Sequence, residues 1–246
     1  MINRCLGCMS GLVMLSEIHP GNGNQLNDFN ALVQAGRWFD LLTVADKEVL
    51  RRQQAENWPD WEFLDSIRLT QQRVIERGAH LLIREFSHAD FMQTPRTNPT
   101  YRSQVWEHLR GEYHVRRAAV VRHPLDQWRS MQSYRWARNR CTLEGFLYGH
   151  RRFAEMSVET GFVRYEDFCR NPAKALTQLC ENLNVPFDAA FSTSWANYTK
   201  VTGDESRAPS GAILARTRPE PDVGALARLQ HSDDYHISLQ LLGYTR

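Results

Sequence analysis

Hydrophobic residues recur at helical spacing along much of the chain, and short apolar runs lie between these stretches. The helical period predicts helices at 10–18, 27–35, 46–56, 60–77, 102–110, 124–138, 142–158 and 172–184. The apolar runs predict buried strands at 80–84, 115–121 and 161–165. Strands that alternate with helices are typical of an α/β fold with a short central parallel sheet flanked by helices. Because 246 residues suffice for one hydrophobic core, we expect a single domain over 1–246.

The composition narrows the class of protein. Hydrophobic residues make up 42% and charged residues 24%, which excludes a disordered chain. No apolar run approaches the ~20 residues of a membrane helix, so we expect no membrane span. Five cysteines, an odd number, favour reduced thiols and a cytoplasmic location over a disulfide scaffold. Cys5 and Cys8 form a Cys-x-x-Cys pair without a second pair of suitable spacing, so we predict no metal site.

Positive charge is concentrated in one region. Arginine supplies 27 of the 30 basic residues, a bias that need not reflect function. Residues 116–152 contain nine Arg and two acids, which gives this region a net charge of +7, whereas the whole chain carries +2. Local charge in a nearly neutral protein suits a small anionic ligand better than a long polyanion. Since no aromatic-basic alternation accompanies it, we expect no nucleic-acid partner.

The most specific motif runs from Val120 to Ser130, with the sequence VVRHPLDQWRS. A predicted strand ends at Arg122, and Pro124 favours a first helical turn. Ser130 lies seven residues beyond His123, so it returns to the same helix face two turns later. We expect Arg122 and Ser130 to converge on one anion at the carboxyl end of the sheet, where ligands bind in open α/β folds. The alternative is a surface Arg and a solvated Ser.

This motif, Arg-x-Pro-x-Asp with Ser eight positions after the Arg, resembles the 3′-phosphate-binding segment of sulfotransferases. These enzymes use 3′-phosphoadenosine-5′-phosphosulfate (PAPS). Residues 165–172 and 184–187 are similar to the family's Tyr-Glu-Asp-Leu and Leu-x-Val-Pro-Phe segments. The resemblance spans most of the chain and implies a P-loop-like sulfotransferase fold that transfers the sulfuryl group of PAPS to a hydroxyl or amine. In the second segment we expect Glu166 and Asp167 to cap the following helix.

The amino terminus resembles the family's loop that grips the 5′-phosphosulfate. Small residues let backbone N–H groups surround an anion, and a following helix adds its dipole. The resemblance implies that the phosphosulfate is held by Arg4, Gly7, Cys8, Met9, Ser10 and Gly11. Only Met1–Asn3 remain for the strand that should precede this loop. Either that strand is very short or the chain begins upstream.

The same loop separates sulfuryl transfer from phosphoryl transfer. A phosphate-transferring P-loop needs Gly-x-x-x-x-Gly-Lys-Ser/Thr, but no Lys occurs before Lys47. No predicted strand end supplies the acidic residue that would hold Mg²⁺. Transfer that relies on Arg and backbone N–H groups fits better. A small-molecule P-loop kinase and a non-catalytic nucleotide-binding or interaction protein of sulfotransferase ancestry are the alternatives.

Transfer also needs a base that takes the proton of the acceptor. The segment after the predicted strand at 80–84 supplies two candidates, His88 first, because histidine titrates near neutrality, and Glu85 second. We expect Arg84 to contact the transferring group. The sequence does not predict which acceptor is used. Small molecules, carbohydrates and lipids are all compatible with it.

Residues 197–221 show little periodicity and contain several Gly and Pro. A loop of this length in a compact domain is usually a ligand cover or a disordered segment. The three arginines Arg207, Arg216 and Arg218 favour a loop that closes over the nucleotide. The oligomeric state is not predicted from the sequence.

Overall fold

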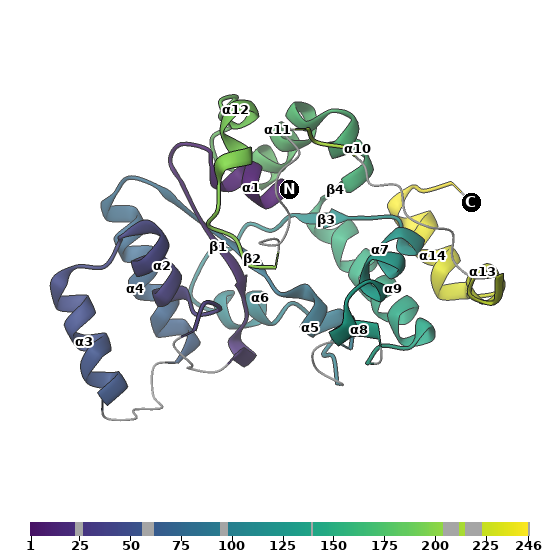
Figure 1. The fold of residues 1–246 in the computed structure, drawn as a ribbon, viewed down its shortest axis with the longest axis horizontal. Coiled ribbons are helices and arrows are strands. Elements are labelled where there is room, and N and C mark those ends of the chain that lie inside the picture. The colour runs from purple at the N-terminus through teal and green to yellow at the C-terminus, as the bar shows by residue number, and fades with distance from the viewer. Residues whose placement is uncertain are drawn as a thin grey trace. The chain divides into compact units, whose positions relative to one another are not determined.

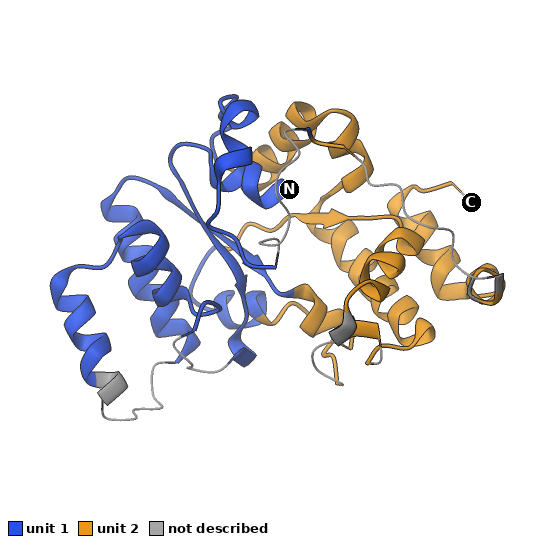
Figure 2. Ribbon diagram, in the orientation of Figure 1, with its two compact units in different colours: residues 1–86, 105–114, 185–212 blue, residues 87–104, 115–184, 213–246 orange. Residues whose placement is uncertain are grey.

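A computed structural model of the chain describes residues 1–22, 27–55, 62–93, 98–138, 140–203, 212–214 and 223–245. These residues fall into two compact units, which are coloured separately in Figure 2. Unit 1 comprises residues 1–86, 105–114 and 185–212, and unit 2 comprises residues 87–104, 115–184 and 213–246. Each unit is a mixture of helices with two short parallel strands, so the predicted α/β class is confirmed.

Unit 1 is built on two parallel strands, β1 (Leu12–Ile18) and β2 (His80–Glu85), with Leu12 opposite His80 and Ser16 opposite Arg84. Helices α2 and α4 pack on each other and on these strands (Figure 1). The helices of this unit are α1 (Ile2–Gly7), α2 (Ala31–Phe39), α3 (Val44–Ala55), α4 (Phe63–Glu76), α6 (Gln104–Leu109) and α12 (Phe191–Ser194), with 3₁₀ turns at Pro20–Asn22 and Trp195–Asn197. The helices predicted at 27–35, 46–56, 60–77 and 102–110 and the strand at 80–84 are therefore confirmed where the structure describes them, with some shifted ends; residues 56, 60 and 61 lie outside the described residues.

The helix predicted at 10–18 is wrong, because this segment forms β1. Every residue of the strand is buried, and a continuous buried run of this length fits a helix or a strand equally well by periodicity. A very short strand at Met1–Asn3, one of the two alternatives for the strand before the loop, does not form, since α1 begins at Ile2. Gly11 adopts φ 72° in the turn between α1 and β1, a conformation that glycine reaches without strain.

The buried amide of Gln34 on α2 contacts the backbone of β1. Its Oε1 accepts the Ser16 N–H at 2.7 Å, and its Nε2 donates to the Ser16 carbonyl at 2.7 Å. Next to these strands, residues of α2 and α4 contribute to an apolar cluster of Val13, Leu32, Ala35, Leu41, Leu42 and Val74. The amide therefore supplies both backbone groups of one buried strand residue with partners, as burial requires.

Unit 2 contains the parallel strands β3 (Ala119–Val121) and β4 (Phe162–Arg164), with Val121 opposite Arg164. Its helices are α5 (Ser87–Phe91), α7 (Pro124–Gln132), α8 (Arg135–Arg138), α9 (Leu143–Thr160), α10 (Tyr165–Arg170), α11 (Pro172–Leu183), α13 (Val223–Gln230) and α14 (Asp233–Leu242). Only 119–121 of the strand predicted at 115–121 pairs, because β4 offers three residues as partners. The other elements predicted in this unit are confirmed, although 124–138 divides into α7 and α8.

Helix α9 lies at the centre of unit 2 and packs on β3, α5, α7 and α14. The core around it includes Phe91, Val121, Phe146, Ala154 and Leu242. Gly149 permits close packing, since a Cβ there would lie 1.7 Å from the carbonyl oxygen of Phe91. Helix α9 therefore contacts the backbone that follows His88 as well as the strand that precedes Arg122.

Within the described ranges, no helix is long and apolar enough to cross a membrane. All five cysteines are free thiols. No three His, Cys, Asp or Glu side chains of the described residues are arranged as metal ligands would be.

Candidate functional site

Arg122 follows β3 directly, at the carboxyl end of the parallel pair in unit 2. Pro124 begins α7 two residues later, as the sequence predicts for a proline at the first helical position. His150 of α9 lies with its Nε2 3.2 Å from the Arg122 carbonyl oxygen. The chain therefore turns from strand to helix at Arg122, which is the position where open α/β folds bind ligands.

The guanidinium of Arg122 stacks on the ring of Tyr165, with Cζ 5.0 Å from the ring centroid. Its Nε is buried and has no hydrogen-bond partner among the described residues. Several other arginines of unit 2 have carboxylate partners, as Arg164 does with Asp167 at 2.8 Å. A buried donor without an acceptor is costly, so an arginine in this state is suited to an anionic ligand.

Ser130 lies in the last turns of α7 and is half-buried. Its carbonyl accepts the hydroxyl of Ser133 at 2.6 Å where the helix ends. The hydroxyl of Ser130 makes no hydrogen bond to the described part of the protein. Arg122 and Ser130 thus belong to the same strand–turn–helix unit, and both keep donors that a ligand can use.

Glu166 and Asp167 do not cap α11, contrary to expectation. Asn171 does so, because its side chain accepts the Lys174 N–H at 3.1 Å. Glu166 instead accepts the His123 N–H at 3.0 Å, and Asp167 pairs with Arg164. Glu166 is therefore hydrogen-bonded to the backbone of the turn at Arg122–Pro124. The sequence does not reveal this long-range contact.

In unit 1, Arg84 lies near the carboxyl ends of β1 and β2. Its Nη2 pairs with Glu17 at 3.0 Å, and its Nη1 donates to the Ser16 hydroxyl and the Thr202 carbonyl, both at 3.2 Å. Thr202 also donates its N–H to the Ser16 hydroxyl at 3.1 Å. Arg84, which the sequence assigned to the transferring group, has protein partners on both terminal nitrogens.

Glu17 adopts a left-handed backbone conformation with φ 57° at an irregularity in the pairing of β1 with β2. Its carboxylate lies against Gly203, where a Cβ would approach Oε1 to 2.7 Å. Such a conformation in a residue other than glycine stores strain that the surrounding contacts must offset. Sequence reasoning missed Ser16, Glu17 and Thr202, because the first two become strand-end residues only when 12–18 is a strand.

The residues assigned to the phosphosulfate make contacts within unit 1. Arg4 is buried and donates to the Tyr198 carbonyl at 2.7 Å. Gly7 packs on the Tyr198 ring, which a Cβ would approach to 2.4 Å. The Cys8 thiol donates to the Cys5 carbonyl at 3.3 Å, and burial raises the pKa of Cys8. Met9 is buried.

Ser10 and Gly11 lie in the turn before β1, at its amino end. The N–H and the hydroxyl of Ser10 both donate to Asp188 Oδ2, at 3.1 and 2.8 Å. The bond from the Ser10 N–H is the largest cause of a lowered pKa of Asp188, followed by bonds from the Ala190 N–H and the Ser10 hydroxyl. The Gly11 carbonyl accepts the His80 N–H at 2.8 Å. The segment 4–11 does not have the predicted order of strand, loop and helix, and its phosphosulfate role stays a prediction.

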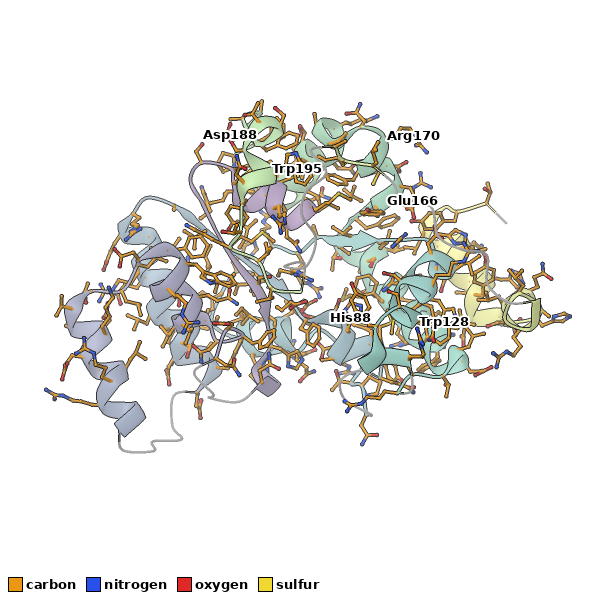
Figure 3. All side chains as sticks on the ribbon, in the orientation of Figure 1. His88, Trp128, Glu166, Arg170, Asp188 and Trp195 are labelled. Atoms are coloured by element: carbon orange, nitrogen blue, oxygen red, sulfur yellow. The ribbon has the colours of Figure 1, made fainter. Side chains whose placement is uncertain are left out.

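The two candidate bases lie on either side of the turn after β2. Glu85 is the last residue of β2, and His88 is the second residue of α5 (Figure 3 labels His88). Both side chains are half-buried. Arg207, Arg216 and Arg218 lie outside the described residues, so the proposed cover over the nucleotide stays a prediction.

The fold is that of a sulfotransferase domain, as two solved structures indicate. The sulfotransferase domain from the curacin biosynthetic pathway aligns with 99% of this chain and 93% of its own length, with a TM-score of 0.59 and 15% identity. The sulfotransferase domain from the Synechococcus PCC 7002 olefin synthase aligns with 100% of this chain and 83% of its own length, with a TM-score of 0.53 and 20% identity. No protein-family model and no curated protein matches the sequence. At these identities the likeness concerns the fold alone, and it agrees with the family resemblance of the motifs.

Proposed function

We propose that this chain is a sulfotransferase that transfers the sulfuryl group of PAPS to a hydroxyl or amine of an acceptor. The observation that carries the proposal is Arg122, whose buried Nε has no acceptor among the described residues, at the carboxyl end of β3 in a sulfotransferase fold. A phosphate oxygen would provide the missing acceptor, and guanidinium–phosphate hydrogen bonds are among the stronger ones.

Arg122 and Ser130 hold the 3′-phosphate in this proposal. The guanidinium is kept in place by the Tyr165 ring, and the turn behind it by His150 and Glu166. The Ser130 hydroxyl adds a neutral donor from the same helix. This arrangement distinguishes nucleotides with a 3′-phosphate from those without it, because the buried donor loses its acceptor when the phosphate is absent.

His88 is the proposed base, with Glu85 as the second candidate. PAPS would supply the sulfuryl group when it is bound. The bond between sulfur and the 5′-phosphate oxygen would break, and the remaining nucleotide would leave as 3′,5′-ADP. His88 takes the proton of the acceptor hydroxyl or amine as the new bond to sulfur forms. Arg84 is left out of the transfer step, because Glu17, Ser16 and Thr202 already engage its terminal nitrogens.

The test compares two nucleotides by their effect on thermal unfolding. We expect 3′,5′-ADP to raise the melting temperature and ADP with Mg²⁺ to leave it unchanged. The opposite pattern would favour a kinase. Stabilisation by PAPS without turnover on any acceptor would support a non-catalytic nucleotide-binding protein of the same fold.

Substitution Arg122→Ala tests the site itself. Loss of charge-assisted hydrogen bonds worth about 1.5–3 kcal/mol should weaken 3′,5′-ADP binding about 10- to 100-fold in calorimetry, with the fold intact. Arg152→Ala is the matched control, because Arg152 carries the same charge in unit 2 but pairs with Glu155. Equal affinities of the wild-type chain and Arg122→Ala would defeat the assignment.

A further inference from the structure

The peptide group between Arg122 and His123 is held by side chains on both of its polar atoms. His150 Nε2 donates to the Arg122 carbonyl at 3.2 Å, and Glu166 Oε1 accepts the His123 N–H at 3.0 Å. Because β3 ends at Val121, neither bond belongs to the sheet. The two bonds fix the orientation of this peptide group and hence the direction in which the Arg122 side chain leaves the backbone.

Glu166 is itself held by a residue from the carboxyl-terminal part of the chain. The Tyr244 hydroxyl donates to Glu166 Oε2 at 2.6 Å, while Oε1 takes the His123 N–H. Short O–H···O bonds to a carboxylate are among the stronger hydrogen bonds in proteins. With both oxygens engaged, the Glu166 carboxylate cannot turn away from His123 without losing two bonds.

Tyr244 is placed by the end of α14 and by Arg164. Gly243 caps the helix with φ 67°, and the Tyr244 N–H donates to the Leu239 carbonyl at 2.9 Å. The Gly243 carbonyl accepts from Arg164 Nη1 at 2.6 Å. Arg164 is the last residue of β4, so this contact joins the end of α14 to the strand beside β3.

The rings of the same residues are also in contact. The His123 ring lies edge-on to Tyr244, with centroids 5.1 Å apart, and to Tyr235 at 6.2 Å. Both tyrosines therefore pack on His123, but only Tyr244 donates a hydroxyl hydrogen bond to Glu166. Burial, and then the bond to Glu166, raise the pKa of Tyr244, which keeps the donor proton on the phenol.

We propose that Tyr244 is a positioning residue for 3′-phosphate recognition, acting through Glu166 on the Arg122–His123 peptide. The inference rests on the proposed function and extends it, because it makes the turn after α14 part of the nucleotide site. Tyr244 acts without a contact to the nucleotide of its own. Its effect should therefore depend on whether the ligand has a 3′-phosphate.

The experiment measures the affinities of 3′,5′-ADP and 5′-AMP by calorimetry for the wild-type chain and for Tyr244→Phe. We expect the variant to bind 3′,5′-ADP about tenfold more weakly, the loss typical of one hydrogen bond to a charged group. Binding of 5′-AMP should stay within about twofold, because this ligand does not use Arg122 in the proposed way. Tyr235→Phe is the matched control, since it removes a hydroxyl from the same aromatic group, and both its affinities should equal those of the wild-type chain.

A second variant, Glu166→Gln, keeps the shape of the side chain but removes its charge. It should lower the 3′,5′-ADP affinity in the same selective way and speed amide hydrogen exchange at His123. Unfolding temperatures of all variants show whether each is folded.

The outcomes separate the inference from the function on which it rests. A wild-type chain that prefers 3′,5′-ADP, together with a Tyr244→Phe variant that keeps this preference, would overturn the positioning role and leave the proposed function standing. An equal loss for both nucleotides would also overturn it, since that indicates general damage to the fold. A wild-type chain without preference for the 3′-phosphate would overturn the proposed function and the positioning role together.

Discussion

His150 should make the stability of this protein depend on pH in a range where few groups of ordinary pKa titrate. It lies fully buried in α9, with Nε2 on the Arg122 carbonyl and with no partner for Nδ1 among the described residues. A carbonyl only accepts, so Nε2 carries the hydrogen. Burial lowers the pKa of His150 from 6.5 to about 4, and the hydrogen bond to the Arg122 carbonyl opposes this shift only in part.

The sign and size of the effect follow from linkage. Between pH 6.5 and about 4 the unfolded chain binds a proton at His150 that the folded chain does not. Stability is therefore fully present above pH 6.5 and is lost as the pH falls toward 4. At about 1.4 kcal/mol for each pH unit, the loss from this residue between pH 7 and pH 4.5 is about 2 kcal/mol.

The assay is urea unfolding at several pH values from 7 to 4.5, on the wild-type chain and on His150→Gln. Glutamine offers an N–H donor to the Arg122 carbonyl but does not titrate. Carboxylates elsewhere affect both proteins equally, so the difference between the two free energies of unfolding isolates His150. We expect the wild-type chain to lose about 2 kcal/mol more than the variant over this range. Parallel curves for the two proteins would refute the reasoning.

Two further predictions concern packing and a partly buried ion pair. Gly149→Ala should lower the free energy of unfolding in urea by about 3 kcal/mol, because its Cβ would meet the Phe91 carbonyl oxygen. Gly145→Ala is the control, since its Cβ would meet only the movable side chain of Gln93, and it should cost less than about 1 kcal/mol. Similar losses for the two variants would contradict the packing argument. Asp46→Asn should cost about 2 kcal/mol at pH 7, because both carboxylate oxygens bond Arg73 at 2.8 Å. The bond to Arg73 lowers the pKa of Asp46 from 3.8 to about 2. The difference in free energy of unfolding between the wild-type chain and Asp46→Asn should therefore shrink as the pH falls from about 4 to about 2. A difference that stays constant over this range would contradict the prediction.

The sequence predicts those elements whose own pattern decides their structure. Helix α11 has Pro172 at its first position and an apolar face, and it begins where the sequence places it. Strand β2 is a short apolar run between polar residues, and it too is predicted correctly. The segment 10–18 was assigned to the wrong element, because a strand buried along its whole length has no alternation that distinguishes it from a buried helix.

The site is only partly predictable for a related reason. Arg122 and Ser130 are found because a strand, a proline and a helix follow one another within a few residues. Contacts such as Tyr244 with Glu166 join residues 78 positions apart, and no local pattern indicates them. The partners of Arg84 depend on the register of β1, so an error in that one element also hides the role of Glu17.

The amide of Gln34 has a consequence for the behaviour of this protein in concentrated solution. It occupies the N–H and the carbonyl of Ser16 in the way that an adjoining strand would. Exposed pairs of such groups invite strands from other molecules, and native proteins protect them against aggregation. At Ser16 the Gln34 side chain engages both groups, and every residue of β1 is buried, so an invading chain finds no free backbone donor or acceptor there.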